Sequence, residues 1–247
     1  MLVADYVAAL RADGELMATA AGAVAPDAPI PTCPEWCMRD LVLHLGQVHR
    51  WAAANLADPR GERANPDAAM GPAPDDAALV DWFRDGYQGL IGALESADPD
   101  GAYWTFMAAP SPLLFWARRQ CHETGIHRAD AQSASGPISG FPTAVAADGI
   151  DELLCSFITR PGGRLKSDEP RTLLVKTNDC DDQWLVRIAD TVSTTRDGAR
   201  GADCTLTGPA SDLHLFLWNR GAADALEVEG DRSLLDVWSG SVTIRWR

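Results

Sequence analysis

Hydrophobic and polar residues recur along the first half of this chain with the spacing of amphipathic helices. In the second segment with this pattern, Leu41, Leu45, Val48 and Ala52 follow one another at intervals of three to four residues and form one apolar stripe. The last segment begins at Pro112, which suits a first helical turn because the missing N–H would be unpaired there anyway. The pattern predicts four helices of bundle length, over residues 2–23, 37–56, 75–96 and 112–133.

The pattern changes after the stretch SASGPISGFP. Residues 143–159 still have a helical pattern, but the segments that follow are short and rich in β-branched residues, which is typical of strands. We expect strands over 171–177, 183–189, 202–208 and 241–246, with helices over 212–220 and 233–239 between them. The predicted fold class is therefore multidomain α+β, with a four-helix bundle over residues 1–144 and a smaller α+β domain over residues 145–247.

The composition of the chain limits the classes of molecule that it is expected to bind. The chain has 247 residues and a net charge of −14, which argues against binding to nucleic acid or to an anionic membrane surface. No stretch approaches the ~20 apolar residues of a membrane-spanning helix, and we see no signal peptide. The six cysteines are scattered and lack the density of a secreted disulfide scaffold. We expect a reduced, cytoplasmic protein that is a monomer or a homodimer.

The candidate chemistry centres on Glu123 and His127, in the stretch WARRQCHETGIHRAD. Four residues make about one helical turn, so both side chains point the same way. An exposed hydrogen-bonded pair has the same spacing, but Trp116 and Ile126 flank the pair and favour a buried face, where both groups need a partner such as a metal. With a histidine from another helix, the pair would form a three-ligand site that is open to water or substrate, as in catalytic metal sites.

The stretch HETGIH differs from the HExxH zincin motif because it has one residue more. His122 and His127 therefore point about 140° apart on a regular helix and cannot share one metal ion. We expect His122 to be a surface residue or a support for the ligands. The helix over 37–56 carries two histidines, His44 and His49, which are also five residues apart, and periodicity does not choose between them.

Two stretches resemble the signatures of the mycothiol-dependent maleylpyruvate isomerase family, a branch of the DinB-like metalloenzyme superfamily. CPEWCMRDLVLHLGQVHRWAA resembles its CPGWTVRDLVAHLGGVHRW-type motif, and HETGIHRAD resembles its second motif, H-E-x-x-x-H-R-x-D. The resemblance covers roughly the first 135 residues. It implies a DinB-like four-helix bundle followed by an α+β domain that is similar to sterol-carrier proteins.

The resemblance also implies site residues. The family's metal ligands fall here on three residues, His44, Glu123 and His127. In the family an arginine of the C-terminal domain is important for activity, and the stretch LFLWNRG places Arg220 at the comparable position; His214 nearby reads more simply as a helix-surface histidine. The chain departs from the family at Cys37, where Thr or Ser often caps the helix. We expect Asp40 to compensate in part by favouring the helix N-terminus.

The residues and the resemblance together predict a metal-dependent enzyme that uses a thiol. Zn²⁺ suits two imidazoles and one carboxylate, with nickel, iron and manganese as alternatives. The thiol, by resemblance mycothiol, would lose its proton on the metal and attack a small electrophile, whose carboxylate Arg220 would hold. Expulsion of the thiol from the adduct would make the protein an isomerase, and retention would make it an S-transferase.

Two other functions are compatible with the same residues. A metal-dependent hydrolase would use bound hydroxide and would need Asp130 or His122 as a general base. A non-catalytic protein would bind a small ligand in an apolar pocket of the C-terminal domain. Turnover that requires a thiol separates the first prediction from the hydrolase, and absence of bound metal would favour the binding protein.

Overall fold

The computed structural model describes residues 1–107, 109, 111–196 and 201–242. The chain divides into two compact units, Met1–Ser139 and Gly140–Arg247. The first is helical and the second contains the sheet, which confirms the α+β class. The proposed domain limits at residues 144 and 145, the DinB-like bundle and the likeness to sterol-carrier proteins stay predictions. None of the described helices has the length and apolarity that crossing a bilayer requires.

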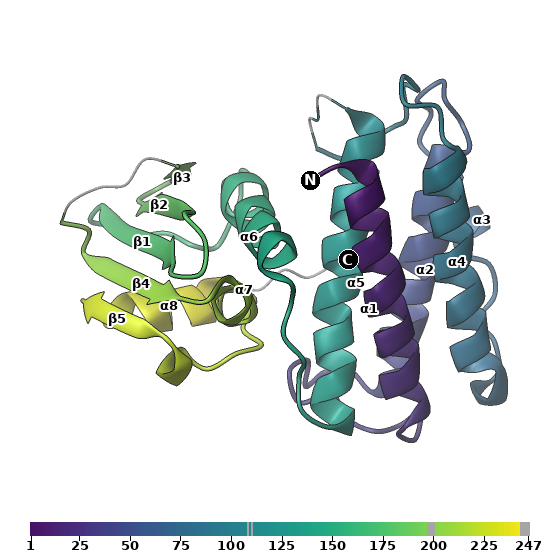
Figure 1. Ribbon diagram of the computed structural model, residues 1–247, viewed down its shortest axis with the longest axis horizontal. Coiled ribbons are helices and arrows are strands. Elements are labelled where there is room, and N and C mark those ends of the chain that lie inside the picture. The colour runs from purple at the N-terminus through teal and green to yellow at the C-terminus, as the bar shows by residue number, and fades with distance from the viewer. Residues whose placement is uncertain (108, 110, 197–200, 243–247) are drawn as a thin grey trace. The chain divides into compact units, whose positions relative to one another are not determined.

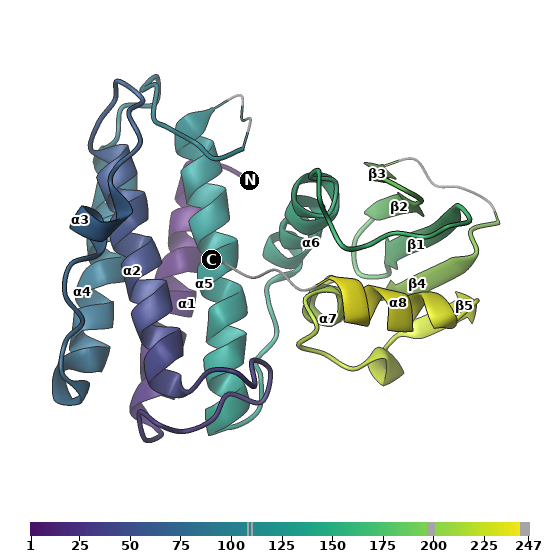
Figure 2. The ribbon, with the colours of Figure 1, turned by 180° about the vertical axis from the view of Figure 1, so that it is seen from behind.

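Four long helices build the first unit (Figures 1 and 2). The helices α1 and α2 each pack against both α4 and α5, and the core lies among the four. A short helix, α3, lies between α2 and α4, outside the expected helices, and a 3-10 turn, η1, occupies the start of the helix expected over 75–96. The bounds are α1 Val3–Gly22, α2 Met38–Leu56, α3 Pro66–Met70, η1 Asp76–Ala78, α4 Leu79–Ser96 and α5 Pro112–Ser135.

Local side chains cap the two helices that carry the candidate ligands. At the start of α2, the carboxylate of Asp40 accepts hydrogen bonds from the backbone N–H and the thiol of Cys37, both at 3.0 Å. These bonds lower the pKa of Asp40, with the backbone N–H contributing most. At the start of α5, Ser111 Oγ accepts from the Leu114 N–H at 3.3 Å and Pro112 is the first helical residue. Asp40 therefore supplies the capping that Cys37 does not.

A close contact between α2 and α4 sets the rotation of α2. The ring of Trp82 lies so near Gly46 that a Cβ atom on Gly46 would overlap with it. The guanidinium of Arg50 stacks on the same ring at 3.8 Å and donates to the carbonyls of Trp82 at 2.7 Å and Gly46 at 2.9 Å. Because Gly46 faces α4, the side chain of His44, two residues earlier, faces a different neighbour.

In its described residues, the second unit combines a mixed five-stranded sheet with three α-helices (Figure 1). The strand order is β3-β2-β1-β4-β5; β1 and β4 are parallel, and the other pairs are antiparallel. Helix α6 continues into a π-helical turn, η2, and packs against α7. The bounds are α6 Thr143–Glu152, η2 Leu153–Phe157, β1 Arg171–Thr177, β2 Gln183–Ile188, β3 Val192–Thr195, β4 Cys204–Gly208, α7 Ala210–Leu217, η3 Ala223–Ala225, β5 Glu227–Gly230 and α8 Ser233–Ser241.

Three of the four expected strands are present, as β1, β2 and β4. The strand expected over 241–246 is wrong at Ser241, which ends α8, and residues 243–246 lie outside the described part of the chain. The edge strands β3 and β5 were not expected. Both are short and largely polar, and they are held by pairing with β2 and β4 rather than by a local pattern.

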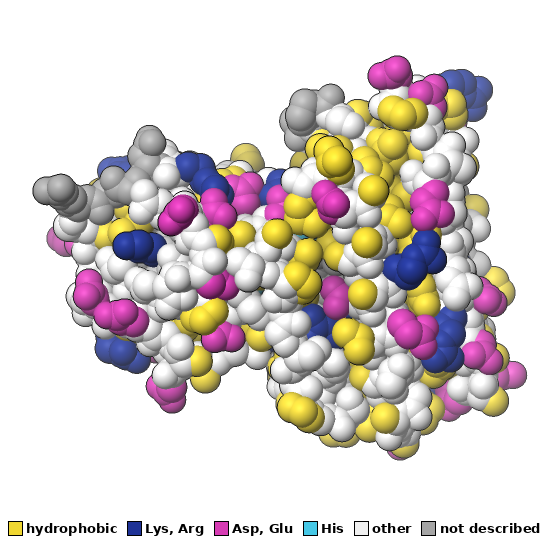
Figure 3. Space-filling model, in the orientation of Figure 1, with side chains coloured by type: hydrophobic (Ala, Val, Ile, Leu, Met, Phe, Trp, Pro, Cys, Tyr) yellow, Lys and Arg dark blue, Asp and Glu magenta, His cyan; other side chains and the backbone are white. Residues whose placement is uncertain are grey.

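On the face shown in Figure 3, acidic side chains are scattered among basic ones.

Candidate metal centre

The structure brings the three predicted ligands together in the first unit. Helix α2 supplies His44, and α5 supplies Glu123 and His127. Oε1 of Glu123 lies 3.4 Å from Nε2 of His44 and 3.3 Å from Nε2 of His127. One ligand atom from each residue lies within 4.8 Å of the other two. The side chain of His44 is 17% exposed and that of Glu123 is 4% exposed, so solvent reaches the cluster mainly at His44.

This donor set fits a divalent ion. Two imidazole nitrogens and one carboxylate oxygen converge, and these are the ligand types that zinc takes in catalytic sites. Ligand atoms bound at ~2.1 Å in a tetrahedron lie about 3.4 Å from one another. The separations between Glu123 Oε1 and the two imidazole nitrogens agree with that value. Three protein donors would leave a further position for an exchangeable ligand.

Asp130 orients His127 from behind. Its Oδ2 lies 2.9 Å from Nδ1 of His127, and its Oδ1 accepts a hydrogen bond from the hydroxyl of Thr32 at 2.6 Å. The Asp130 carboxylate thus holds the proton on Nδ1, so that Nε2 is the nitrogen directed at the cluster. Burial acts to lower the pKa of His127, but the hydrogen bonds to Asp130 and Glu123 outweigh burial and raise that pKa to about 9.

Arg119 supports the carboxylate of Glu123. It lies one turn earlier on α5, and its Nη2 donates to Oε2 of Glu123 at 2.8 Å, with side-chain exposures of only 1% and 4%. Burial opposes the ionisation of Glu123, but the charge of Arg119 and the hydrogen bonds from the two histidines hold its pKa well below 4.5. Sequence analysis missed Arg119, although its spacing of four residues from Glu123 is a recognisable signal.

Trp36 covers the two imidazoles. Its ring centroid lies 4.9 Å from that of His44 and 5.9 Å from that of His127, on which it stacks at 28°. The loop that carries it is held by two backbone hydrogen bonds, from Trp36 N–H to the Cys33 carbonyl at 2.8 Å and from Ile30 N–H to the Trp36 carbonyl at 3.1 Å. Trp36 belongs to the CPEWC motif, and sequence analysis did not single it out.

His49 is not part of the cluster. It is fully buried, and its Nε2 donates to the hydroxyl of Thr124 at 2.9 Å, which in turn donates to the Gln120 carbonyl at 2.7 Å. Periodicity left the choice between His44 and His49 open, and the packing of α2 against α5 places His44 beside Glu123. His49 links the two helices inside the core.

The burial of His49 predicts a pH dependence of stability. Burial lowers its pKa from 6.5 to about 3, so between these values the unfolded chain binds a proton that the folded protein does not. The contribution is present above pH 6.5 and is lost as the pH falls. We expect the free energy of unfolding to drop by about 2 kcal/mol more between pH 7 and pH 5 in the wild type than in His49→Gln. Urea denaturation at both pH values measures this, and equal drops would contradict it.

Two other histidines are placed differently from expectation. His122 is only 2% exposed and packs edge-on against Tyr6 of α1, so its expected place on the surface is wrong. The reason is that α5 is buried around most of its circumference. His214 is fully buried in the second unit, where its ring lies 4.9 Å from that of Phe141, so it is not a helix-surface residue either.

Arg220 lies just beyond α7 in the second unit. It is half-buried, and its guanidinium donates to the Trp218 carbonyl at 2.6 Å. The preceding residue, Asn219, has a φ of 61° and reverses the chain after the helix. The role expected for Arg220, to hold a carboxylate of the substrate, remains a prediction.

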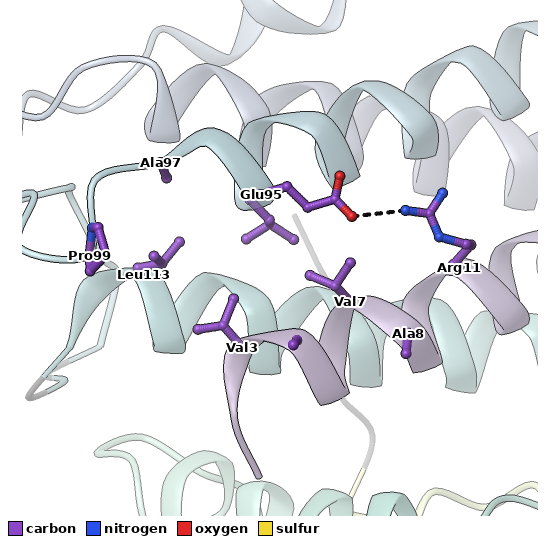
Figure 4. Close-up of a pocket in the computed structure, with 10 residues that line it drawn as sticks. Val3, Val7, Ala8, Arg11, Glu95, Ala97, Pro99 and Leu113 are labelled. Carbon is purple, nitrogen blue, oxygen red and sulfur yellow. Dashed lines mark hydrogen bonds and ion pairs between the residues drawn. The ribbon is translucent and has the colours of Figure 1, made fainter.

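A separate pocket of about 530 Å³ lies in the first unit, between the start of α1, the end of α4 and the start of α5 (Figure 4). An ion pair between Arg11 and Glu95, at 2.9 Å, borders it. Its lining includes none of the three candidate ligands, so this pocket is distinct from the candidate centre. Its lining is mostly apolar and consists of Val3, Ala4, Val7, Ala8, Arg11, Leu94, Glu95, Ala97, Pro99 and Leu113.

Solved structures with a similar fold include the mycothiol-dependent maleylpyruvate isomerase and a mutant of it. The TM-scores are 0.67 and 0.66, each at 12% sequence identity and over 93% of both chains. At this identity the similarity shows a shared fold. The ubiquinone synthesis protein UbiJ-SCP2 aligns at 23% identity over 39% of this chain and 92% of its own, with a TM-score of 0.28 that supports no argument.

Comparison of the sequence with protein families covers most of the chain. No curated protein matches it in sequence. The mycothiol maleylpyruvate isomerase N-terminal domain matches residues 7–132, which include the whole cluster of candidate ligands, and the C-terminal domain of the same family matches residues 144–236. The chain therefore belongs to the mycothiol-dependent maleylpyruvate isomerase family.

Proposed function

We propose that this protein is a metal-dependent enzyme that uses a low-molecular-weight thiol, mycothiol by its family, to act on a small electrophile. The observation that carries the proposal is the convergence of His44, Glu123 and His127 into one cluster of donor atoms. These residues would hold a divalent ion, with Zn²⁺ the best fit to the donor set. The reaction would be isomerisation or S-transfer.

The side chains around the cluster prepare it for this chemistry. A bound divalent ion would lower the pKa of a thiol beside it and so supply a thiolate at neutral pH. Arg119 keeps the Glu123 carboxylate ionised, and Asp130 keeps the Nδ1 proton on His127 so that Nε2 faces the cluster. Trp36 covers one side of the two imidazoles and excludes water there. Glu123 and His127 are thus oriented before any substrate arrives.

The electrophile decides the outcome of the reaction. A thiolate that adds to a carbon–carbon double bond forms a C–S bond and leaves a single bond that can rotate. If the C–S bond then breaks and the thiol leaves, the double bond is restored in the other configuration. If the carbanion is protonated instead, the thioether is the product. We propose that Arg220 holds a carboxylate of the substrate through its planar guanidinium.

The surroundings of Asp130 favour the thiol-using enzyme over the hydrolase. Both of its oxygens are engaged, Oδ1 by Thr32 and Oδ2 by His127. The other expected base, His122, packs against Tyr6 of α1. Neither residue is therefore placed as a hydrolase would require, because a general base must lie within reach of the water that it activates.

The proposal is tested by metal content and thiol-dependent turnover of protein purified without a histidine tag. We expect about one ion per chain and consumption of maleylpyruvate only when mycothiol is present, and Glu123→Ala should lose both the ion and the turnover. Elemental analysis and chromatography of the substrate measure these outcomes. Turnover without thiol would support a hydrolase, and a folded wild type without metal would support a binding protein; either result would overturn the proposal.

A further inference from the structure

A cluster of five aromatic rings lies in the first unit, apart from the candidate ligands. Neighbouring rings are 5.0 to 6.5 Å apart between centroids. Trp116 is fully buried and forms the base of the cluster, whereas the other four rings are half-buried. The exposed guanidinium of Arg63 lies over two of them, at 5.8 and 5.2 Å. The five rings are those of Trp51, Trp104, Phe106, Phe115 and Trp116, and with Arg63 we call them the aromatic cluster.

Hydrogen bonds hold the indole rings of the aromatic cluster in place. Trp51 Nε1 donates to the Ala64 carbonyl at 3.1 Å, and Trp116 Nε1 donates to the Trp104 carbonyl at 2.8 Å. Because both N–H groups are used internally, neither indole has its N–H left for a ligand, and recognition by Trp51 would depend on its ring. A surface whose rings are already ordered loses little conformational entropy when a ligand binds.

The aromatic cluster is aligned with the candidate metal centre along two helices. On α2, Trp51 comes seven residues after His44, and on α5, Trp116 comes seven residues before Glu123. Seven residues are about two helical turns, which keeps both side chains of each pair on one face and separates them by about 10 Å along the axis. The pairs Trp51–Trp116 and His44–Glu123 are therefore successive contacts of the same two helices.

We propose that the aromatic cluster binds the non-reacting, ring-bearing end of the thiol, an inference that rests on the proposed function. A small electrophile must touch the sulfur at the metal centre and cannot also reach a surface about 10 Å away. A thiol with a sugar end can, because its sulfur and its rings lie at opposite ends of an extended molecule. The C–H face of a sugar ring packs on an indole face, and Arg63 donates to its oxygens.

Because of this distance, the rings of the aromatic cluster cannot bind an electrophile that reacts at the metal centre. The site would then have two parts: the candidate metal centre would recognise the sulfur, and the aromatic cluster would recognise the remainder of the thiol. A thiol without a ring-bearing end would then use only the first part. Affinity for such a truncated thiol should not depend on Trp51 or Arg63.

The test is calorimetric titration of the zinc-loaded full chain with mycothiol and, separately, with N-acetylcysteine, which has no ring. Trp51→Leu should weaken mycothiol binding about tenfold and Arg63→Ala about threefold, with N-acetylcysteine unchanged. Arg60→Ala is the matched control, since this exposed arginine of the same loop pairs with Asp58 at 2.8 Å and should leave both affinities unchanged. Trp51→Phe keeps a ring and should retain most of the mycothiol affinity.

The outcomes separate this inference from the proposed function. Suppose that the wild type holds zinc and binds both thiols. If Trp51→Leu and Arg63→Ala then bind mycothiol as tightly as the wild type does, or lose affinity for mycothiol and N-acetylcysteine to the same extent, the role of the aromatic cluster is overturned and the proposed function stands. Wild type that holds zinc and binds neither thiol would overturn the proposed function and this inference with it. If Trp51→Leu does not fold, Arg63→Ala decides the result, because Arg63 lies on the surface and its loss of mycothiol affinity is expected without a loss of fold.

Discussion

Replacing His127 by alanine is expected to reduce bound metal from about one ion per chain to less than about a tenth. The substitution removes one of three converging donors and leaves the buried carboxylate of Glu123 with one imidazole fewer. Two remaining donors bind a divalent ion far more weakly, and the buried carboxylate of Asp130 also loses the partner that it orients. Elemental analysis of dialysed, untagged protein measures the loss.

His49→Ala is the matched control. This histidine lies on the same helix as His44 and is fully buried, but its Nε2 is hydrogen-bonded to Thr124 and does not face the cluster. We expect His49→Ala to retain its metal while losing some stability, because it leaves a cavity in the core. Equal metal loss in His49→Ala and His127→Ala, with both proteins folded by circular dichroism, would show that the ligand assignment is wrong.

Arg128→Met is expected to lower the free energy of unfolding by about 3–5 kcal/mol and to leave the metal content unchanged. Arg128 follows His127 in the HRAD motif, yet its side chain is 1% exposed and its Nε donates to Asp13 of α1 at 3.0 Å. Its Nη1 also donates to Gln132 at 2.9 Å and to the hydroxyl of Ser139 at 3.0 Å. Burial raises the pKa of Asp13 against the opposing charge of Arg128. Removing the arginine leaves a buried carboxyl without its partner.

Two further variants calibrate this prediction. The double variant Asp13→Leu with Arg128→Met removes both charges and should recover part of the lost stability. Arg11 lies on α1, as Asp13 does, and forms an ion pair with Glu95 in which both side chains are more than half exposed. Arg11→Met breaks this exposed pair and should change the unfolding free energy by no more than about 1 kcal/mol. Urea denaturation gives the stabilities. If Arg128→Met lost its metal at unchanged stability, Arg128 would belong to the site rather than to the packing of α1 on α5.

The helical unit was predictable because its pattern is local. The expected helices over 37–56 and 112–133 correspond to α2, Met38–Leu56, and α5, Pro112–Ser135, since the apolar stripe of the first and the proline at the first turn of the second are both local signals. The strands β3 and β5 could not be found in this way. Their residues are exposed in large part, and the hydrogen bonds that define them come from β2 and β4, which are distant in the sequence.

The sequence by itself determined that Glu123 and His127 share one face of a helix, because a spacing of four residues is one turn whatever surrounds it. Resemblance to the family added His44. Periodicity did not choose between the two histidines of α2; the tertiary structure places His44 at that face, because the contact of Gly46 with Trp82 sets the rotation of the helix. It also brought Trp36 and the Thr32–Asp130 pair to the imidazoles from loop and helix positions that no periodicity connects. Contacts between separate elements depend on packing, and packing is not a local property of the chain.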